Sequence, residues 1–217
     1  MDSDEVRHHW ESRSGAYSPE YYAYRGPDDA SEAVLALLER HLGPDPSVLE
    51  LGCSSGRHLA HLRDEGVEDL SGVEVNPDAF DVMAEAYPDL ADAGTFYEAA
   101  IEDVVEAFAD GQFDLVYSVE TLQHLHPDLE WVLDELVRIT DGLLVTVESE
   151  PEAEEGDGGR ERDPAAGDVP DHVDVRYVDD EFPLYYRDWN EAFTGRGLRE
   201  LESGTTKRDT VRAFRAP

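Results

Sequence analysis

Apolar and polar residues alternate in blocks along most of the chain. Short apolar runs bounded by turn residues predict strands, and the stretches between them carry apolar residues at helical spacing. The predicted strands lie at residues 47–51, 70–75, 95–99, 113–118 and 143–147, and the predicted helices lie near residues 28–42, 57–65, 77–86, 101–109 and 128–139. Because strands that alternate with helices form parallel βαβ units, the pattern predicts an α/β fold.

The C-terminal part adds two more strands to this pattern. A last helix is predicted at residues 187–193, and two strand-like runs follow at residues 198–203 and 209–216, separated by GTTKR. Two such runs can pair as an antiparallel hairpin at the sheet edge. We therefore expect a doubly wound, Rossmann-like sheet of seven strands, mostly parallel with an antiparallel C-terminal hairpin, and helices on both faces.

Two segments depart from the alternation. Residues 1–28 are rich in aromatic side chains and end in the breaker pair Gly26-Pro27. Residues 149–170 carry Gly, Pro, Glu and Asp with almost no apolar content, so we expect an acidic exposed loop there. The chain thus divides into an N-terminal segment, residues 1–28, and one domain, residues 29–217, a length that suits a single compact core.

The charge of the chain is extreme. It has 52 acidic and 17 basic residues, a formal net charge of −35, and Lys207 is its one lysine. Because the acids are scattered through segments that are expected to fold, they must coat the surface, which resembles the habit of haloarchaeal proteins. Nucleic-acid binding needs clustered Lys and Arg, so this composition argues against nucleic acid as a partner.

The remaining composition excludes several classes. Cys53 is the single cysteine, which excludes an intrachain disulfide and a multi-cysteine metal site and favours a small buried side chain. No stretch approaches the ~20 apolar residues of a membrane-spanning helix, and the N-terminus lacks the features of a signal peptide. We expect a cytoplasmic protein without membrane insertion, and the oligomeric state is left open.

The most informative segment is VLELGCSSGRHL, residues 48–59. A buried strand ends in Glu50, turns through Gly52 and Gly56, and enters a helix, so the chain can approach a ligand closely at the carboxyl end of the strand. A nicotinamide dinucleotide would require glycines at positions 52, 54 and 57, where the sequence has Gly, Ser and Arg. Glu50 also disfavours a pyrophosphate, so a cationic ligand fits better.

This segment resembles motif I of class I S-adenosylmethionine-dependent methyltransferases, hydrophobic-hydrophobic-[DE]-x-G-x-G-x-G. The resemblance implies S-adenosylmethionine as the cofactor, with Glu50 near its amino-acid end. It also implies that Gly52, Cys53, Ser54 and Gly56 line the cofactor's path. Ser54 stands where the family has its middle glycine, a departure that adds a side chain to the turn.

Further cofactor contacts are expected at the ends of the next strands. Glu74 lies 24 residues after Glu50, at the end of the second strand, where a carboxylate accepts hydrogen bonds from the ribose hydroxyls. Val75 beside it and Ser118 in the fourth strand belong to the same expected cofactor-binding set.

The adenine end of the site departs from the family. Many relatives carry an aspartate after the third strand for the adenine amine, but Ala100 takes that place here. The amine would then meet Glu102, Asp103, a backbone carbonyl or water, while Ile101 packs on the ring.

The FDLV strand and the segment after it, residues 113–127, resemble the family region beneath the transferring methyl group. His124 is therefore the candidate catalytic base, and the alternative is a structural histidine. His126, in a His-Pro turn, is expected to cap or to lie on the surface. The pair suggests a metal, but no third ligand accompanies it, so no metal is expected.

The segment FPLYYRDWNEAF resembles a subgroup of methylases of nonulosonic sugar pathways, which implies a sugar or glycan-linked acceptor. Tyr22, Tyr185 and Arg187 are the expected acceptor-binding residues, with Arg187 pairing with an acidic substrate. The alternative is an ordinary aromatic core at the last helix. We also expect residues 1–28 to form a lid over the cofactor and acceptor, and residues 29–217 to form the methyltransferase domain.

The sequence thus predicts methyl transfer from S-adenosylmethionine to a small-molecule or glycan-type acceptor, with an oxygen or carboxylate acceptor favoured. Two alternatives remain open. One is a different enzyme on the same fold, such as an aminopropyl transferase or a nicotinamide oxidoreductase, which the missing third glycine disfavours. The other is a non-catalytic protein that still binds S-adenosylmethionine or a nucleotide.

Overall fold

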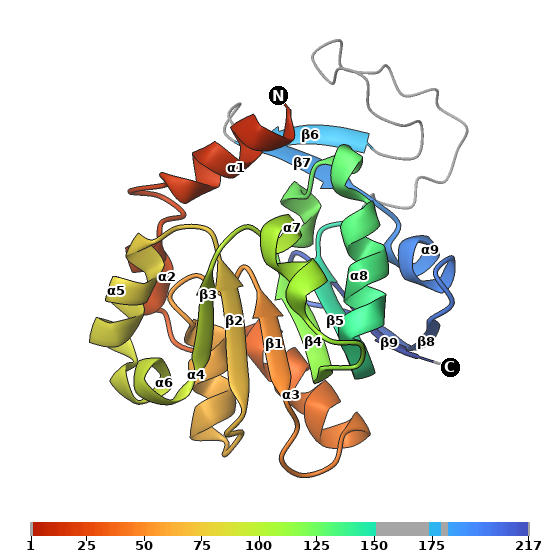
Figure 1. Cartoon of the computed structure of the whole chain (residues 1–217), viewed down its shortest axis with the longest axis horizontal. Helices are drawn as coiled ribbons and strands as arrows, with labels where there is room; N and C mark the ends of the chain where they lie inside the picture. Colours follow the sequence, from red (N-terminus) through yellow and green to blue (C-terminus); the bar gives the residue numbers. More distant parts are fainter. Residues whose placement is uncertain (1, 151–173, 179–181, 217) are drawn as a thin grey trace.

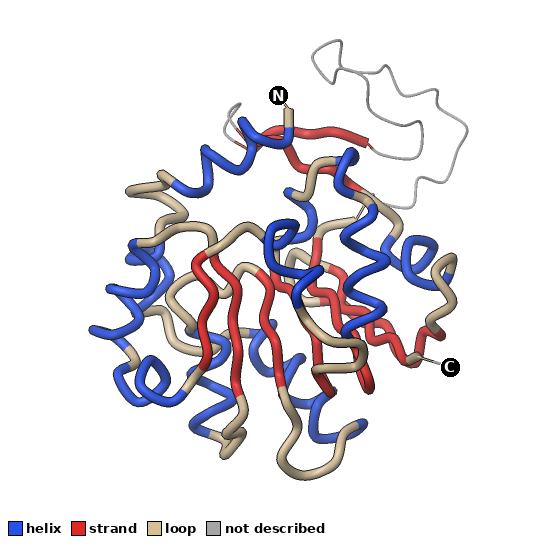
Figure 2. The backbone as a smooth tube through the Cα atoms, in the orientation of Figure 1, coloured by secondary structure: helices blue, strands red, loops and turns tan. Residues whose placement is uncertain are grey.

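A seven-stranded sheet forms the centre of the molecule in the computed structural model, which describes residues 2–150, 174–178 and 182–216 (Figures 1 and 2). Its strand order is β3-β2-β1-β4-β5-β9-β8. The strands are β1 (Val48–Leu51), β2 (Leu70–Glu74), β3 (Thr95–Glu98), β4 (Phe113–Val119), β5 (Thr140–Glu148), β8 (Arg199–Thr205) and β9 (Thr210–Arg215). β1 to β5 pair in parallel, while β9 is antiparallel to both β5 and β8. The predicted doubly wound sheet with its C-terminal hairpin is confirmed.

Helices cover both faces of this sheet, as predicted (Figure 1). One apolar core packs α3 (Asp29–His41), α4 (Arg57–Asp64), α5 (Asp78–Ala86) and α6 (Pro88–Ala93) on one face. The second core packs α7 (Ile101–Val104), the short helix η1 (Val105–Ala107), α8 (Trp131–Ile139) and α9 (Trp189–Thr194) on the other. Neighbouring strand residues such as Val48 and Leu49 enter opposite cores, because successive side chains of a strand point to opposite faces.

Local sequence explains where the flanking helices begin. Asp28 caps α3 by accepting from the backbone N–H groups of Ala30 and Ser31, and the Ser31 hydroxyl accepts in return from the backbone N–H of Asp28. This reciprocal capping fixes the start of the helix. Gly56, with φ of 80°, precedes α4 directly, so the glycine turn leads straight into a helix.

A second layer lies beyond the carboxyl ends of the parallel strands, and the apolar pattern did not predict it. It consists of α1 (Ser3–Glu11), α2 (Pro19–Ala23) and a separate two-stranded sheet of β6 (Asp174–Val178) and β7 (Phe182–Tyr186). Figure 1 shows α1 beside β6 and β7, and Val6 of α1 packs against Tyr185 of β7. Most of the expected acidic loop at residues 149–170 lies outside the described residues. Within the described ranges, no helix is long and apolar enough to cross a membrane.

Candidate functional site

A cavity of about 370 Å³ lies at the carboxyl ends of the parallel strands. Its volume is in the range of small-molecule sites, and this end of an open α/β sheet is where such folds bind ligands. The lining combines the segments that follow β1 to β4 with the N-terminal layer. It includes Trp10, Arg13, Tyr17, Tyr22, Gly52, Cys53, Ser54, Arg57, Glu74, Val75, Asn76, Ala100, Ile101, Glu102, Glu120, Thr121, Gln123 and His124.

The glycine turn after β1 forms the floor of the cavity. Gly52 has φ of 66°, and a Cβ at this position would overlap the Thr121 side chain, so the protein itself also requires glycine there. Ser54 takes φ of 48°, a conformation that glycine adopts without strain, and its N–H donates to Glu74 Oε2 over 2.9 Å. The turn is therefore held by the next strand.

Glu50 lies directly behind this turn rather than in the lining. The side chain is 1% exposed, and its Oε2 has no hydrogen-bond partner within the described residues. Burial raises the pKa of Glu50 well above its usual value. The Tyr117 hydroxyl favours the charged form of this carboxyl, and a cationic group brought to this end of the cavity would favour it further.

Glu74 holds the cavity wall together at the end of β2. Its Oε1 accepts from the backbone N–H of Asn76 over 2.7 Å and its Oε2 from that of Ser54 over 2.9 Å. Burial raises the pKa of Glu74. Each carboxylate oxygen keeps acceptor capacity beyond one hydrogen bond, so the residue can hold the turn and still accept from ligand hydroxyls.

The segment after β3 forms the adjoining wall. Ala100, Ile101 and Glu102 line the cavity. Arg7 of α1 reaches this wall, with its guanidinium 3.9 Å from the Glu102 carboxylate and 3.2 Å from that of Asp103. Burial raises the pKa of Glu102. The N-terminal layer is thus tied by ion pairs to the wall where the adenine was expected.

His124 faces the cavity from the short helix η2 (Leu122–His124), which follows β4. Its Nδ1 lies 3.1 Å from the carbonyl oxygen of Pro183, and the Trp10 ring packs 4.6 Å away between centroids. A carbonyl only accepts, so Nδ1 carries the proton and Nε2 keeps a lone pair. Burial lowers the pKa of His124 to about 4, so the imidazole is neutral near pH 7.

Four further residues of the expected set lie outside the cavity lining: Gly56, Ser118, Tyr185 and Arg187. The Ser118 hydroxyl donates to Glu148, and the Arg187 guanidinium, 2% exposed, donates to the carbonyl oxygens of Leu125 and Tyr185. Of the three residues expected to bind the acceptor, only Tyr22 lines the cavity. Two guanidinium nitrogens of Arg187 donate to the backbone, and its Nε lies 3.8 Å from the Glu130 carboxylate, so the side chain is held inside the fold rather than turned toward the cavity.

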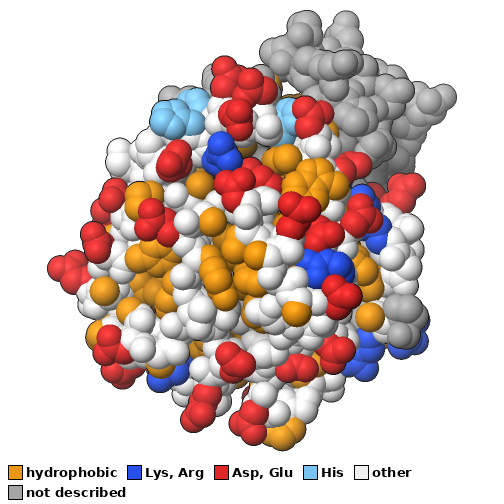
Figure 3. Space-filling model, in the orientation of Figure 1, with side chains coloured by type: hydrophobic (Ala, Val, Ile, Leu, Met, Phe, Trp, Pro, Cys, Tyr) orange, Lys and Arg blue, Asp and Glu red, His pale blue; other side chains and the backbone are white. Residues whose placement is uncertain are grey.

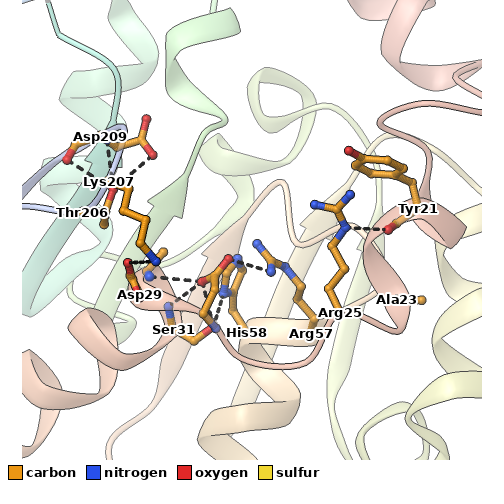
Figure 4. Close-up of polar contacts among 12 residues, drawn as sticks. Tyr21, Ala23, Arg25, Asp29, Ser31, Arg57, His58, Thr206, Lys207 and Asp209 are labelled. Atoms are coloured by element: carbon orange, nitrogen blue, oxygen red, sulfur yellow. Dashed lines mark hydrogen bonds and ion pairs between the residues drawn. The ribbon is translucent and has the colours of Figure 1, made fainter.

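Two residues that line the cavity were not predicted from the sequence, although each lies in a segment that was expected to form the site. Arg57 directly follows the glycine turn, and its guanidinium pairs with Asp28 over 2.7 Å, in the cluster where Ser31 also contacts His58 (Figure 4). Glu120 begins the turn after β4 with φ of 49°. Burial, with Asp209 close by, raises the pKa of Glu120 to about 6.

His126 acts as a cap, as interpreted: its Nδ1 accepts from the backbone N–H of Asp128 over 3.2 Å. Across the described part of the chain, no three His, Cys, Asp or Glu side chains are gathered in a way that could hold a metal ion.

Comparison with known proteins agrees with this geometry. Residues 49–145 match the family model described as methyltransferase domain. The chain is 30% identical over 124 residues to the O-antigen chain terminator bifunctional methyltransferase/kinase of Escherichia coli, a match that covers 52% of this chain and 17% of that protein. It is 33% identical over 140 residues to the chloroplastic tocopherol O-methyltransferase of Arabidopsis thaliana, covering 58% and 39%. The chain therefore spans well under half the length of the curated relatives it matches.

Among solved structures, the chain resembles 1,6-didemethyltoxoflavin-N1-methyltransferase of Burkholderia thailandensis, solved with 1,6-didemethyltoxoflavin and S-adenosylhomocysteine. The TM-score is 0.63 at 17% identity, over 87% of this chain and 78% of that one. The chain thus has the fold of S-adenosylmethionine-dependent methyltransferases, and residues 49–145 are similar to the methyltransferase domain model.

Proposed function

We propose that the chain is an S-adenosylmethionine-dependent methyltransferase that acts on an oxygen, hydroxyl or carboxylate, of a small-molecule or glycan-type acceptor. The observation that carries the proposal is the cavity at the carboxyl ends of β1, β2 and β4, where Glu50 is buried behind the glycine turn and Glu74 lines the wall. The cofactor supplies a sulfonium methyl group, and the new O–C bond forms as the S–C bond breaks, which leaves S-adenosylhomocysteine.

The residues proposed to hold the cofactor follow the cavity from end to end. Glu50 lies at its amino-acid end, Glu74 accepts from the ribose hydroxyls, and Ile101 and Glu102 meet the adenine. Gly52, Cys53, Ser54 and Val75 line the path between them. Gly56 and Ser118 lie outside the lining. Gly56 shapes the turn, and the Ser118 hydroxyl donates to Glu148.

His124 is proposed as the proton acceptor for a hydroxyl substrate. Its neutral imidazole, with Nδ1 fixed on Pro183, leaves the Nε2 lone pair available. A positioned base contributes about 10²–10⁴ in rate when its pKa lies near the working pH, and the lowered pKa of His124 places its contribution at the lower end of that range. A carboxylate acceptor brings its own lone pair and needs no base.

Residues 1–28 are proposed as a lid over the cofactor and acceptor. Trp10, Arg13, Tyr17 and Tyr22 line the cavity, and the Arg13 carbonyl accepts from the Asn76 side chain over 3.0 Å. The lid is thus tied to the ribose end of the site, and its aromatic rings face the acceptor.

Two relatives support an oxygen or glycan acceptor. One is named as a tocopherol O-methyltransferase and the other as an O-antigen chain terminator, whereas the solved structure is named as an N1-methyltransferase. The aromatic wall of Trp10, Tyr17 and Tyr22 suits a ring-shaped acceptor such as a sugar or a phenol.

The test has two stages. Calorimetry with S-adenosylhomocysteine should first show binding. Incubation with S-adenosylmethionine carrying a CD₃ group and a fractionated metabolite extract should then give a product heavier by one CD₃ label. Binding without any labelled product across extracts and purified glycans would favour the non-catalytic alternative, and failure to bind would overturn the proposal itself.

A further inference from the structure

Glu148 ends β5 and is fully buried, at 0% exposure. Its Oε1 accepts from the Ser118 hydroxyl over 2.7 Å, from the backbone N–H of Thr121 over 3.2 Å and from that of Leu122 over 3.0 Å. Its Oε2 accepts from the backbone N–H of Gln123 over 3.1 Å. One buried carboxylate thus takes four hydrogen bonds, three of them from consecutive backbone amides.

These three amides are the opening N–H groups of helix η2. A short helix cannot satisfy its first N–H groups internally, and the side chain of Thr121, at the cap position, does not cap it but donates to the Val119 carbonyl. The cap comes instead from the neighbouring strand. A second link reinforces it, since the backbone N–H of Ser149 donates to Gln123 Oε1 over 2.9 Å.

The segment that Glu148 holds joins both halves of the cavity. Thr121 packs against Gly52, the glycine of the cofactor turn, and His124 closes the same helical turn with its imidazole against Trp10 and the Pro183 carbonyl. A shift of this segment would move the His124 imidazole relative to the turn that receives the cofactor.

We infer that Glu148 is the positioning residue of the transfer site: by capping η2 from β5, its carboxylate sets the orientation of His124 and the packing of Thr121 on the cofactor turn. This inference rests on the proposed function for the chemical role of His124. The positioning of η2 by Glu148 is supported by the four hydrogen bonds alone.

The side chain has to be a carboxylate of this length. Glutamine would place an NH₂ donor against a backbone N–H, because all four partners are donors and a carboxamide has one acceptor atom. Alanine would leave three backbone N–H groups buried without partners. Burial raises the pKa of Glu148 to about 7 and the four hydrogen bonds oppose that rise, so the ionised form that accepts all four is the main form above pH 7.

The test reads the His124 tautomer directly, so it does not depend on knowing the acceptor. In protein labelled with ¹⁵N-histidine, the ring nitrogens of His124, assigned by loss of the signals in a His124→Gln variant, should show the Nδ1–H tautomer. In Glu148→Gln and Glu148→Ala they should move to a mixture dominated by Nε2–H. The affinity for S-adenosylhomocysteine should fall on the order of tenfold, because the cofactor turn loses its support from Thr121.

Two control variants separate positioning from general loss of stability. Val147→Ala opens a buried apolar site one residue earlier on the same strand, so it should lower the melting temperature and leave the His124 signals as in the wild type. Ser118→Ala removes one of the four hydrogen bonds and keeps the carboxylate, so it should give a small shift in the same direction even if the Glu148 variants fail to fold.

Unchanged His124 signals in a folded Glu148→Gln variant would overturn the inference, as would an equal change in Val147→Ala. A Ser118→Ala variant without any shift would count against it if the Glu148 variants do not fold. A changed tautomer with no catalytic loss in His124→Ala would instead refute the base assignment and leave the positioning intact.

Discussion

Glu74 carries the sharpest expectation at the scale of single residues. Its carboxylate closes the glycine turn through the backbone N–H of Ser54 and faces the cavity, so Glu74→Ala removes a charged acceptor from both. Hydrogen bonds to charged groups contribute about 1.5–3 kcal/mol, and calorimetry should show S-adenosylhomocysteine binding weakened by roughly 10- to 150-fold. Glu98→Ala is the matched control, because Glu98 is exposed and pairs with Glu74 across β2 and β3. Equal affinity in both variants would remove Glu74 from the ribose site.

A pH-dependent effect is expected at Glu148. Its pKa of about 7 lies above the ordinary glutamate value of 4.5, so the folded state favours the protonated form. The stability that comes from this preference is complete below pH 4.5 and is lost as the pH rises through 7, a loss on the order of 3 kcal/mol. Urea unfolding between pH 4.5 and 8 should therefore show Glu148→Gln gaining on the wild type as the pH rises. A constant difference across that range would contradict the raised pKa.

Several residues that line the cavity could be predicted from the sequence, but the residue that holds the segment after β4 in place could not. Gly52, Ser54 and Glu74 line the cavity because a motif places residues at strand ends, and strand ends meet at one edge of a parallel sheet. Glu148 could not be identified as a cap, since its four partners lie 25 to 30 positions away and depend on the pairing of β4 with β5. A motif carries no such information.

At the scale of elements, the attachment of the N-terminal layer can be tested at Asn76. Its side chain donates to the Arg13 carbonyl and accepts from the backbone N–H of Asp78, so it joins the layer to the start of α5. Asn76→Ala should loosen residues 12–28, and trypsin should then cut faster after Arg13 and Arg25. S-adenosylhomocysteine should slow the cleavage if this segment closes over the cofactor. Cleavage at the wild-type rate would show that the layer is held elsewhere, for example through Tyr87 and the Ala23 carbonyl.

The sequence predicted those elements whose buried residues form either a continuous apolar run, as in a buried strand, or a repeat at helical spacing. β4 and β5 enter both cores, so their apolar runs are continuous, and α8 buries Val132, Leu133 and Leu136 at helical spacing. α1 and β7 give no such signal. α1 buries only Val6, and β7 contains Pro183, which disfavours a strand assignment. Their structure depends on packing against each other.

At the scale of the whole molecule, charge is the dominant feature. Acidic side chains lie scattered over the visible face of Figure 3, with few Lys or Arg among them. Acidic residues outnumber basic ones by about three to one, so most surface carboxylates have no cationic neighbour to pair with. Some ion pairs that do form, such as Lys207 with Asp29 over 3.0 Å at the start of α3, are exposed and contribute little each.

Salt should therefore stabilise the fold rather than weaken it. Folding brings a net charge of −35 together, and the distance over which charges interact shrinks from about 10 Å at 0.1 M salt to about 3 Å at 1 M. Screening weakens attraction and repulsion alike, but repulsion dominates here because acids outnumber bases threefold. We expect screening to raise the free energy of unfolding by a few kcal/mol between 0.1 M and 2 M KCl. Each kcal/mol raises the melting temperature of a domain of this size by roughly 2–4 °C, so the melting temperature should rise on the order of 10 °C. Sucrose at equal osmolality is the control, because it acts through exclusion from the surface without screening charge. A melting temperature that stays flat in KCl, or that rises equally in sucrose, would show that charge repulsion does not limit the stability of this protein.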